Sequence, residues 1–353
     1  MPCLWIVSWL KSRAIIAVPF ATSATRATAP GNVCGRLLYC YSVTRSALRA
    51  FAGFSLLTLL ASGCATVNRV AVKRVAGTLA EGGDSVTSHD DPDLIAGAMP
   101  FALMLHESLL ASVPTFEPLL TTTCSLYAQY AFGFLAAEAE ALQRDDYDRS
   151  QYVTGRALKL AERGRKYCWR GLEVTFRGIT EALKVDPARA LMRAKKEHVP
   201  LLYWSAAALG AAISTGGIEH PELLIDWPVV RALAERALAL DATWHNGSIP
   251  ELMITVESQG DALGGSEERA RRYFARAVAI QQGLSPAPYV SLATGVAKAN
   301  QDRDEFTRLL DQALAIDPEK DPSHRLITLI TQKRARLLLE RIDDLFLEPA
   351  PRP

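Results

Sequence analysis

Helical periodicity constrains this chain more than any other feature of its sequence. Beyond residue 64, apolar residues recur at the spacing of amphipathic helices, and the alternation typical of half-buried strands is rare. Asp91 is a candidate N-cap, and Pro92 follows at the first helical position. One face of this helix then carries Leu94, Ala98, Phe101, Leu105 and Leu109. Pro100 is expected to kink or split the helix, and the pattern as a whole predicts an all-α fold.

Later segments support the same fold class. The stretch "GSEERARRYFARAVAIQQG" predicts a helix that Ser266 caps and that ends at Gly283. Residues 321–347 predict one long closing helix with an apolar face towards the core. The sequence "NGS" at 246–248 predicts a turn.

A helix ending rich in Ala and Leu recurs along the chain. It aligns four alanines, spaced 55, 40 and 36 residues apart: Ala182, Ala237, Ala277 and Ala313. The recurrence resembles the tetratricopeptide repeat, a helical hairpin of about 34 residues. Because one hairpin cannot bury its apolar face, the resemblance implies degenerate hairpins stacked as a short α-solenoid. An ordinary helical bundle is the alternative.

The longest apolar run after residue 64 is Leu201–Ile213, "LLYWSAAALGAAI". It is too short to cross a bilayer, which takes about 20 apolar residues. A short helix that is apolar on every side is typically buried inside a helical protein. We therefore expect this segment to be a core helix.

The N-terminal region resembles a targeting segment. Residues 1–63 carry six basic residues and no acidic one. The stretch "VTRSALRAFAGFSLLTLLASGC" ends at Cys64 and combines arginines, an apolar region and small residues, as signal peptides do. It resembles the lipobox of bacterial lipoproteins, which implies that Cys64 is acylated, and Ala65 implies the outer membrane. A short buried helix is the alternative.

These features predict an organisation along the chain. Residues 1–63 form a signal peptide with an N-terminal extension, and the true signal covers about 43–63, starting at Val43. A lipid-anchored linker with a first short helix follows over 64–90. The helical-repeat domain covers 91–348, and 349–353 are a disordered tail.

Two cysteines remain after Cys64, namely Cys124 and Cys168. In an oxidising periplasm they could form a disulfide, and two buried free thiols are the alternative. No C-x-x-C motif indicates a zinc or redox site.

No catalytic constellation is visible. The six histidines form no HExxH motif, and neither a GxSxG elbow nor a P-loop occurs. We therefore expect no enzyme activity, no metal site and no cofactor. The formal net charge of +1 does not indicate a nucleic-acid partner.

Aromatic and polar residues near helix ends are the remaining candidates for binding. Concave faces of helical solenoids commonly bind ligands or peptides. The candidates for such a groove are Tyr127, Tyr130, Trp204, Trp244, Glu257 and Tyr289. Packing within and between repeats is the alternative role for each of them.

Taken in order, several segments resemble the T component of tripartite ATP-independent periplasmic (TRAP) transporters over residues 64 to 347. They are "DDPDLIAGAMPFALMLHESLLASVP", "LLYWSAAALGAAIS", "GGSEERARRYFARAVAI" with "SPAPYVSLATGVA", and "DRDEFTRLLDQALAIDP" with "LITQKRARLLLERIDDLFL". The resemblance implies a non-enzymatic periplasmic lipoprotein that partners a periplasmic solute-binding protein. It also implies a homotrimer with clefts for a hydrophobic ligand. A repeat lipoprotein that acts as an adaptor in envelope assembly is the alternative function.

Overall fold

The computed structural model describes residues 71–75, 77–78 and 84–347. The predicted signal and Cys64 lie outside these residues. Every regular element within the described part is a helix, so the all-α prediction is confirmed. The stacking of tetratricopeptide hairpins stays a prediction.

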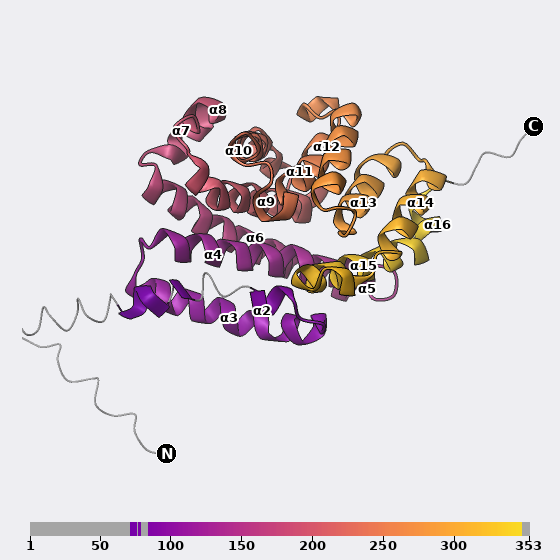
Figure 1. Ribbon diagram of the computed structural model, residues 1–353, viewed down its shortest axis with the longest axis horizontal. Helices are drawn as coiled ribbons and strands as arrows, with labels where there is room; N and C mark the ends of the chain where they lie inside the picture. The colour runs from indigo at the N-terminus through magenta and orange to yellow at the C-terminus, as the bar shows by residue number, and fades with distance from the viewer. Residues whose placement is uncertain (1–70, 76, 79–83, 348–353) are drawn as a thin grey trace, which may run out of the picture. The chain divides into compact units, whose positions relative to one another are not determined.

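Most of the described chain folds into α-helices (Figure 1). Their bounds are α2 Asp84–Thr87, α3 Pro92–Ser112, α4 Glu117–Ala128, α5 Ala137–Leu142, α6 Tyr147–Thr175, α7 Ile179–Val185, α8 Pro187–Ala190, α9 Val199–Gly216, α10 Trp227–Leu240, α11 Trp244–Glu257, α12 Glu267–Ile280, α13 Ala287–Leu292, α14 Arg303–Leu314, α15 Arg325–Glu340 and α16 Ile342–Leu345. Two π-helical stretches, η1 Gln129–Ala136 and η6 Ala293–Ala297, extend α4 and α13.

The helices pack mainly against their neighbours in the sequence. Helix α6 lies between α4 and α9, α10 packs on α9, and α12 packs on α11 (Figure 1). Gly164 permits the close approach of α6 to α4, because a Cβ at this position would lie 2.6 Å from Cβ of Tyr127. The largest core cluster spans α6 to α11 and includes Leu172, Leu209 and Met253.

Two helices are long and apolar enough to cross a membrane by composition, and they differ in burial. In the segment Lys196–Gly216, which contains α9, 61% of the apolar window is buried within the fold. This agrees with the prediction of a core helix at Leu201–Ile213. In α3 only 22% of the window is buried, so the described part of the fold covers this apolar helix incompletely.

The local helix signals are present as predicted. The Asp91 side chain accepts hydrogen bonds from the backbone N–H groups of Asp93 and Leu94 at the start of α3. The Ser266 side chain accepts one from Arg269 N–H at the start of α12. Each of these caps acts on backbone groups within three residues, which is why sequence alone indicates them.

The split that Pro100 could have caused is absent, since α3 continues through this residue. Two other expectations differ from the structure. The single closing helix over 321–347 is wrong: a 3₁₀ turn, η8 Pro322–His324, precedes α15, and a break at Arg341 separates α15 from α16. Ala237, Ala277 and Ala313 are fully buried as the repeat alignment requires, whereas Ala182 is exposed. Short α7 buries Ile179 and Leu183 instead, so its register is shifted by one residue.

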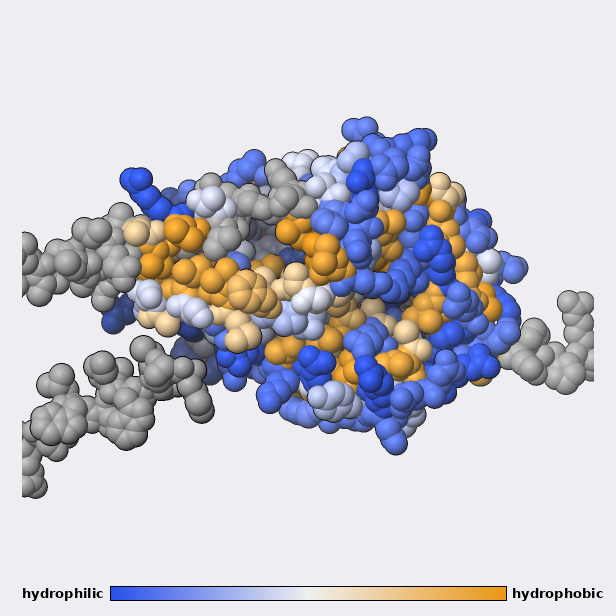
Figure 2. Space-filling model, turned by 90° about the horizontal axis from the view of Figure 1, so that it is seen from below, coloured by the Kyte–Doolittle hydropathy of each residue, from blue (hydrophilic) through white to orange (hydrophobic). Residues whose placement is uncertain are grey.

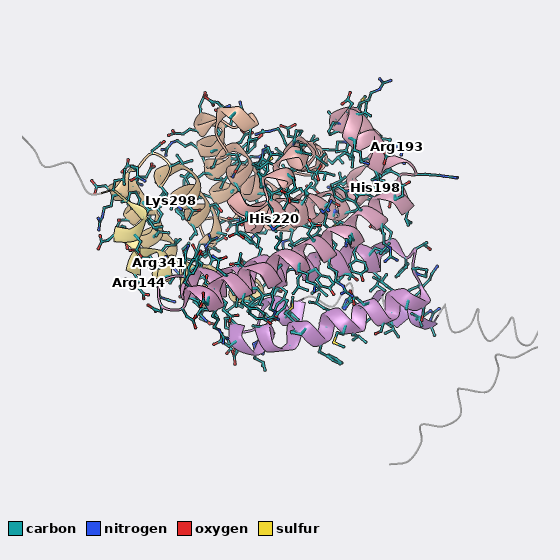
Figure 3. All side chains as sticks on the ribbon, turned by 180° about the vertical axis from the view of Figure 1, so that it is seen from behind. Arg144, Arg193, His198, His220, Lys298 and Arg341 are labelled. Carbon is teal, nitrogen blue, oxygen red and sulfur yellow. A yellow bond between two sulfur atoms is a disulfide. The ribbon has the colours of Figure 1, made fainter. Side chains whose placement is uncertain are left out.

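Helix α15 connects the C-terminal part of the chain to the first helices. It contacts α13 and α14 and also α2 and α3. Arg334 of α15 donates to the Glu140 carboxylate of α5 at 3.1 Å. Arg341, which follows α15, donates to Gln143 Oε1 at 3.2 Å and lies near Arg144 in Figure 3. The C-terminal part of the described chain therefore contacts its first helices.

Candidate functional site

The start of α11 contains a left-handed backbone run. His245, Asn246 and Gly247 have φ values of 46°, 53° and 80°. Non-glycine residues rarely adopt this conformation, and such strain concentrates at functional sites. The Ser248 hydroxyl stabilises the turn by donating to the His245 carbonyl at 2.7 Å. The turn predicted at "NGS" is thus present, and it places two aromatic side chains at the beginning of α11.

A continuous series of aromatic rings extends from this turn to two other elements. The Trp244 ring lies 4.9 Å from that of Tyr203 on α9, and 5.2 Å from that of His245. The His245 ring in turn lies 6.0 Å from that of His324 in η8. Residues from α9, α11 and η8 therefore converge, although they are far apart in the sequence.

Glu251 lies one turn further along α11, and its carboxyl group lies below the protein surface. Its carboxyl group accepts a hydrogen bond from Gln281 Nε2 at 3.2 Å, and no ion pair involves it in the part of the chain that the structure describes. Burial raises the pKa of Glu251 to about 7. Burial, and next the nearby charge of Glu251, raise the pKa of Tyr203 as well. The carboxyl group is therefore largely protonated at mildly acidic pH and can donate a hydrogen bond there.

Two further observations distinguish the residues around Glu251 from fully packed core. Gln281 Oε1 is buried without a hydrogen-bond partner among the described residues. Part of the surface is accessible for Tyr203, Trp244 and Glu251, and His245 is exposed. Even so, burial shifts the pKa values of Tyr203, His245 and Glu251. Unpaired polar atoms beside accessible aromatic rings suit recognition of a ligand with an apolar body and a polar end. We call Tyr203, Trp244, His245, Glu251, Gln281 and His324 the α9–α11 cluster.

The predicted groove residues do not gather at one place. Tyr127 and Tyr130 are buried in a separate core cluster with residues of α3 and α6. The Tyr127 hydroxyl donates to Glu107 Oε1 at 2.7 Å, as does that of Tyr167. Arg163 also binds this carboxylate through two nitrogens, at 2.5 and 2.7 Å. This polar group joins α3, α4 and α6, so Tyr127 has a structural role.

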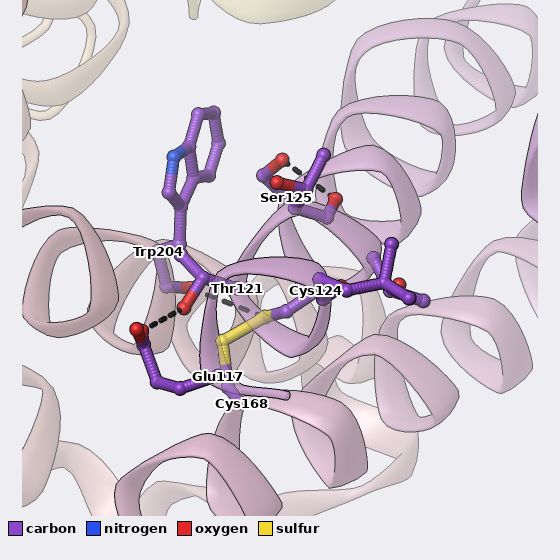
Figure 4. The surroundings of a disulfide bond; sticks show 9 residues. Glu117, Thr121, Cys124, Ser125, Cys168 and Trp204 are labelled. Atoms are coloured by element: carbon purple, nitrogen blue, oxygen red, sulfur yellow. Dashed lines mark hydrogen bonds between the residues drawn. A yellow bond between two sulfur atoms is a disulfide. The ribbon is translucent and has the colours of Figure 1, made fainter. Parts of the chain in front are cut away.

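Trp204 lies beside the disulfide in Figure 4. Cys124 of α4 and Cys168 of α6 are fully buried and joined by this bond, with their Cα atoms 5.4 Å apart. Trp204 packs against the core cluster that contains both cysteines, and its ring contacts that of Tyr203 at 5.0 Å. Trp204 therefore lies between the disulfide and Tyr203 and is not a member of the α9–α11 cluster, whereas Trp244 is a member.

Glu257 is buried at the end of α11 and forms two ion pairs. Its carboxylate accepts hydrogen bonds from Arg231 at 3.0 Å and from Arg269 at 2.9 Å. The pairs join α10, α11 and α12 and leave the carboxylate no free role. The Glu257 carboxylate is therefore engaged in ion pairs, unlike that of Glu251 two turns earlier.

Tyr289 lies on α13 and lines a shallow surface groove of about 380 Å³ between α12, α13 and α14. Its ring contacts that of Phe274 at 5.3 Å, and an ion pair between Arg271 and Glu305 at 2.6 Å borders the groove. This groove does not include Trp244 or Tyr203. Among the described residues, no group of three His, Cys, Asp or Glu side chains could hold a metal ion.

The six groove candidates chosen from the sequence leave out five members of the α9–α11 cluster: Tyr203, His245, Glu251, Gln281 and His324. Two signals could have found part of it. Asn246-Gly247 directly follows Trp244 and His245, and Glu251 is the first charged residue in the apolar segment "IPELMITV". The contact with His324 has no signal in the sequence, because 79 residues separate it from His245.

Comparison with known proteins now gives the family. A family model described as TRAP transporter T-component matches residues 88–346. An uncharacterized protein of Treponema pallidum (strain Nichols) is 29% identical over 269 residues, which cover 74% of this chain and 82% of that protein. TRAP transporter components are associated with the cell envelope and with transport rather than with enzymatic catalysis. Because the family model covers most of the chain, the protein belongs to the TRAP transporter T-component family.

Proposed function

We propose that this protein is a periplasmic lipoprotein that binds the solute-binding protein of a TRAP system and holds a hydrophobic ligand. Membership of the T-component family supports the transport role. The signal-like segment ending at Cys64 supports a lipid anchor, and Ala65 supports the outer membrane. The protein acts as a homotrimer in this proposal, with no catalytic step of its own.

The α9–α11 cluster is the proposed ligand site. The observation that carries this is the Glu251 carboxyl group, which forms no ion pair with any residue that the structure describes. It lies near Tyr203, whose ring contacts that of Trp244, and both rings are partly accessible. An apolar ligand body would contact the rings, and a polar end would meet the carboxyl group and the free Gln281 Oε1. A ligand with a carboxylic acid or hydroxyl end fits both polar groups.

Extraction and mass spectrometry of ligand from the purified protein test the ligand site. We expect a bound amphiphile in the parent chain and its loss in Glu251→Ala and Trp244→Ala. Tyr289→Ala changes the separate surface groove and is the matched control, which should keep the ligand. Equal ligand content in all four proteins would contradict the assignment of the site.

Crosslinking in cells tests the partner. We expect the lipoprotein to be crosslinked to the solute-binding protein of its TRAP system, and size-exclusion chromatography with light scattering should give the mass of a trimer. Crosslinking to outer-membrane assembly proteins alone would instead support the envelope adaptor. Intact-protein mass spectrometry of the membrane fraction should find acyl groups on Cys64.

A further inference from the structure

The outward face of α3 is an apolar stripe. Its exposed residues recur at helical spacing: Leu94, Gly97, Ala98, Phe101, Met104, Ser108 and Ala111. Leu94, Phe101 and Met104 keep 57%, 72% and 68% of their surface accessible. Figure 2 shows hydrophobic side chains gathered on the face of the molecule where α3 lies. Apolar patches of this kind mark surfaces that bind a protein or a membrane.

The stripe carries no uncompensated charge. The two acidic residues of α3 both have cationic partners: Asp93 contacts Lys333 at 3.3 Å, and Glu107 contacts Arg163 at 2.5 Å. The opposite face of α3 is the buried one, with Met99, Leu103 and Leu110 in the core. Helix α3 is therefore apolar on both sides, and among the residues that the structure describes only one side is covered.

The chain before α3 links this surface to the proposed lipid anchor. Val72 packs against the core cluster of Leu110 and Val113 at the C-terminal end of α3. Eight residues separate Cys64 from Val72, and a fully extended chain of that length spans at most about 29 Å. An acyl group on Cys64, which is part of the proposed function, would thus keep this end of α3 close to the bilayer.

Basic side chains border the same end of the stripe. Lys73 and Arg74 are exposed, and the Lys73 ammonium group lies 5.7 Å from the centre of the Phe116 ring. Arg170 donates to the Pro114 carbonyl at 2.8 Å, just after α3. Cations beside an apolar helix face are the arrangement that binds anionic membrane surfaces.

We propose that the outward face of α3 lies on the bilayer surface, with Phe101 and Met104 among the acyl chains and Lys73 and Arg74 at the headgroups. The short link to Cys64 and the flanking cations favour a lipid surface over a second copy of the chain. The apolar face of the helix adds a second contact with the bilayer, beside the acylated Cys64. The helix would also fix the orientation of the protein, which a flexible anchor alone does not.

Methionine oxidation tests this with controls inside the chain. Met104 and Met192 are similarly exposed, at 68% and 71%, whereas Met99 and Met253 are buried. The full-length acylated protein is placed in vesicles of phosphatidylethanolamine and phosphatidylglycerol and treated with hydrogen peroxide. Each reactive thioether takes one oxygen atom from hydrogen peroxide and becomes a sulfoxide, and the peroxide is reduced to water. We expect Met104 to react at least about tenfold more slowly than Met192, because a water-borne oxidant is depleted in the hydrocarbon region. Met99 and Met253 should stay unreacted and thereby report that the protein is folded.

Two variants separate the possible causes of protection. Phe101→Glu places a charge in the exposed stripe and should restore oxidation of Met104 in vesicles. Cys64→Ala without vesicles should show equal rates at Met104 and Met192. Two outcomes would overturn the proposal. The first is equal oxidation rates of Met104 and Met192 in the acylated parent with vesicles. The second is protection of Met104 in Cys64→Ala without vesicles, which would indicate that a second copy of the chain covers the stripe. The mass of the N-terminal peptide in the same samples reports the acylation of Cys64 separately.

Discussion

The imidazole rings of His245 and His324 lie 6.0 Å apart and nearly perpendicular, at 88°. His245 belongs to the left-handed turn of α11, and His324 belongs to η8, just before α15. The contact joins the middle of the chain to its C-terminal part. His324 is itself held by Asp321, whose carboxylate lies 2.8 Å from Nδ1.

Removing His324 should change how His245 titrates. Burial, and next the charge of His324, lower the pKa of His245 below its ordinary 6.5. His324→Gln should therefore raise the pKa of His245, which an NMR titration of the imidazole protons measures. His220→Gln alters an exposed histidine that pairs with Glu222 at 3.0 Å, and it serves as the control. An unchanged pKa of His245 in His324→Gln would show that the two rings do not interact.

Glu251 should make the protein less stable as the pH rises. Its folded-state pKa of about 7 lies above the ordinary 4.5, so its full contribution to stability is present below pH 4.5 and is lost as the pH rises through 7. The loss amounts to about 2–3 kcal/mol. Glu251→Gln should therefore show a smaller fall in the free energy of unfolding between pH 5 and pH 8 than the parent, measured by urea denaturation. Glu181 lies on the exposed face of α7. The free energy of unfolding of Glu181→Gln should therefore fall by as much as that of the parent between pH 5 and pH 8.

The disulfide should stabilise the fold substantially. Cys124 and Cys168 close a loop with a sequence separation of 44. Replacing both by alanine should lower the free energy of unfolding by about 2–4 kcal/mol. Denaturation with and without a reductant checks this, because the reductant should destabilise the parent but not the double variant. A parent whose stability does not respond to reductant would argue against the bond.

Glu257 should matter for stability rather than for ligand binding. Its carboxylate is 2% exposed and pairs with Arg231 and Arg269. Glu257→Gln removes the carboxylate that pairs with Arg269 and the closer of the two carboxylates that pair with Arg231, the other being Glu235 at 3.6 Å. Because it breaks a buried ion pair, the substitution should cost about 3–5 kcal/mol. Glu268→Gln changes an exposed carboxylate on α12 and should stay within about 0.5 kcal/mol of the parent. If Glu257→Gln abolished ligand content at full stability, Glu257 would be part of the ligand site.

Part of the candidate site was accessible from the sequence. The six predicted groove residues include Trp244, which lies in the α9–α11 cluster, and Trp204, which lies between the disulfide and Tyr203. The other four lie elsewhere. Tyr127 and Tyr130 are in a separate core cluster, Glu257 is in an ion-pair group, and Tyr289 lines the separate surface groove. Residue type marks a side chain as suited to binding, but its neighbours decide whether it has surface left for a ligand. Glu257 and Glu251 lie on the same helix, but Glu257 pairs with the arginines of α10 and α12, whereas Glu251 accepts a hydrogen bond from Gln281.

The sequence by itself determined the helices, their capped starts at Asp91 and Ser266, and the burial of α9. These depend on residues within about four positions of each other, since backbone hydrogen bonds and helical spacing are local. Only the tertiary structure decided that α15 returns to α3, that His324 meets His245, and that α3 leaves one apolar face uncovered. Such contacts depend on the packing of every intervening helix. The periodicity of the sequence indicates which face of a helix is apolar, but it does not indicate which other element covers that face.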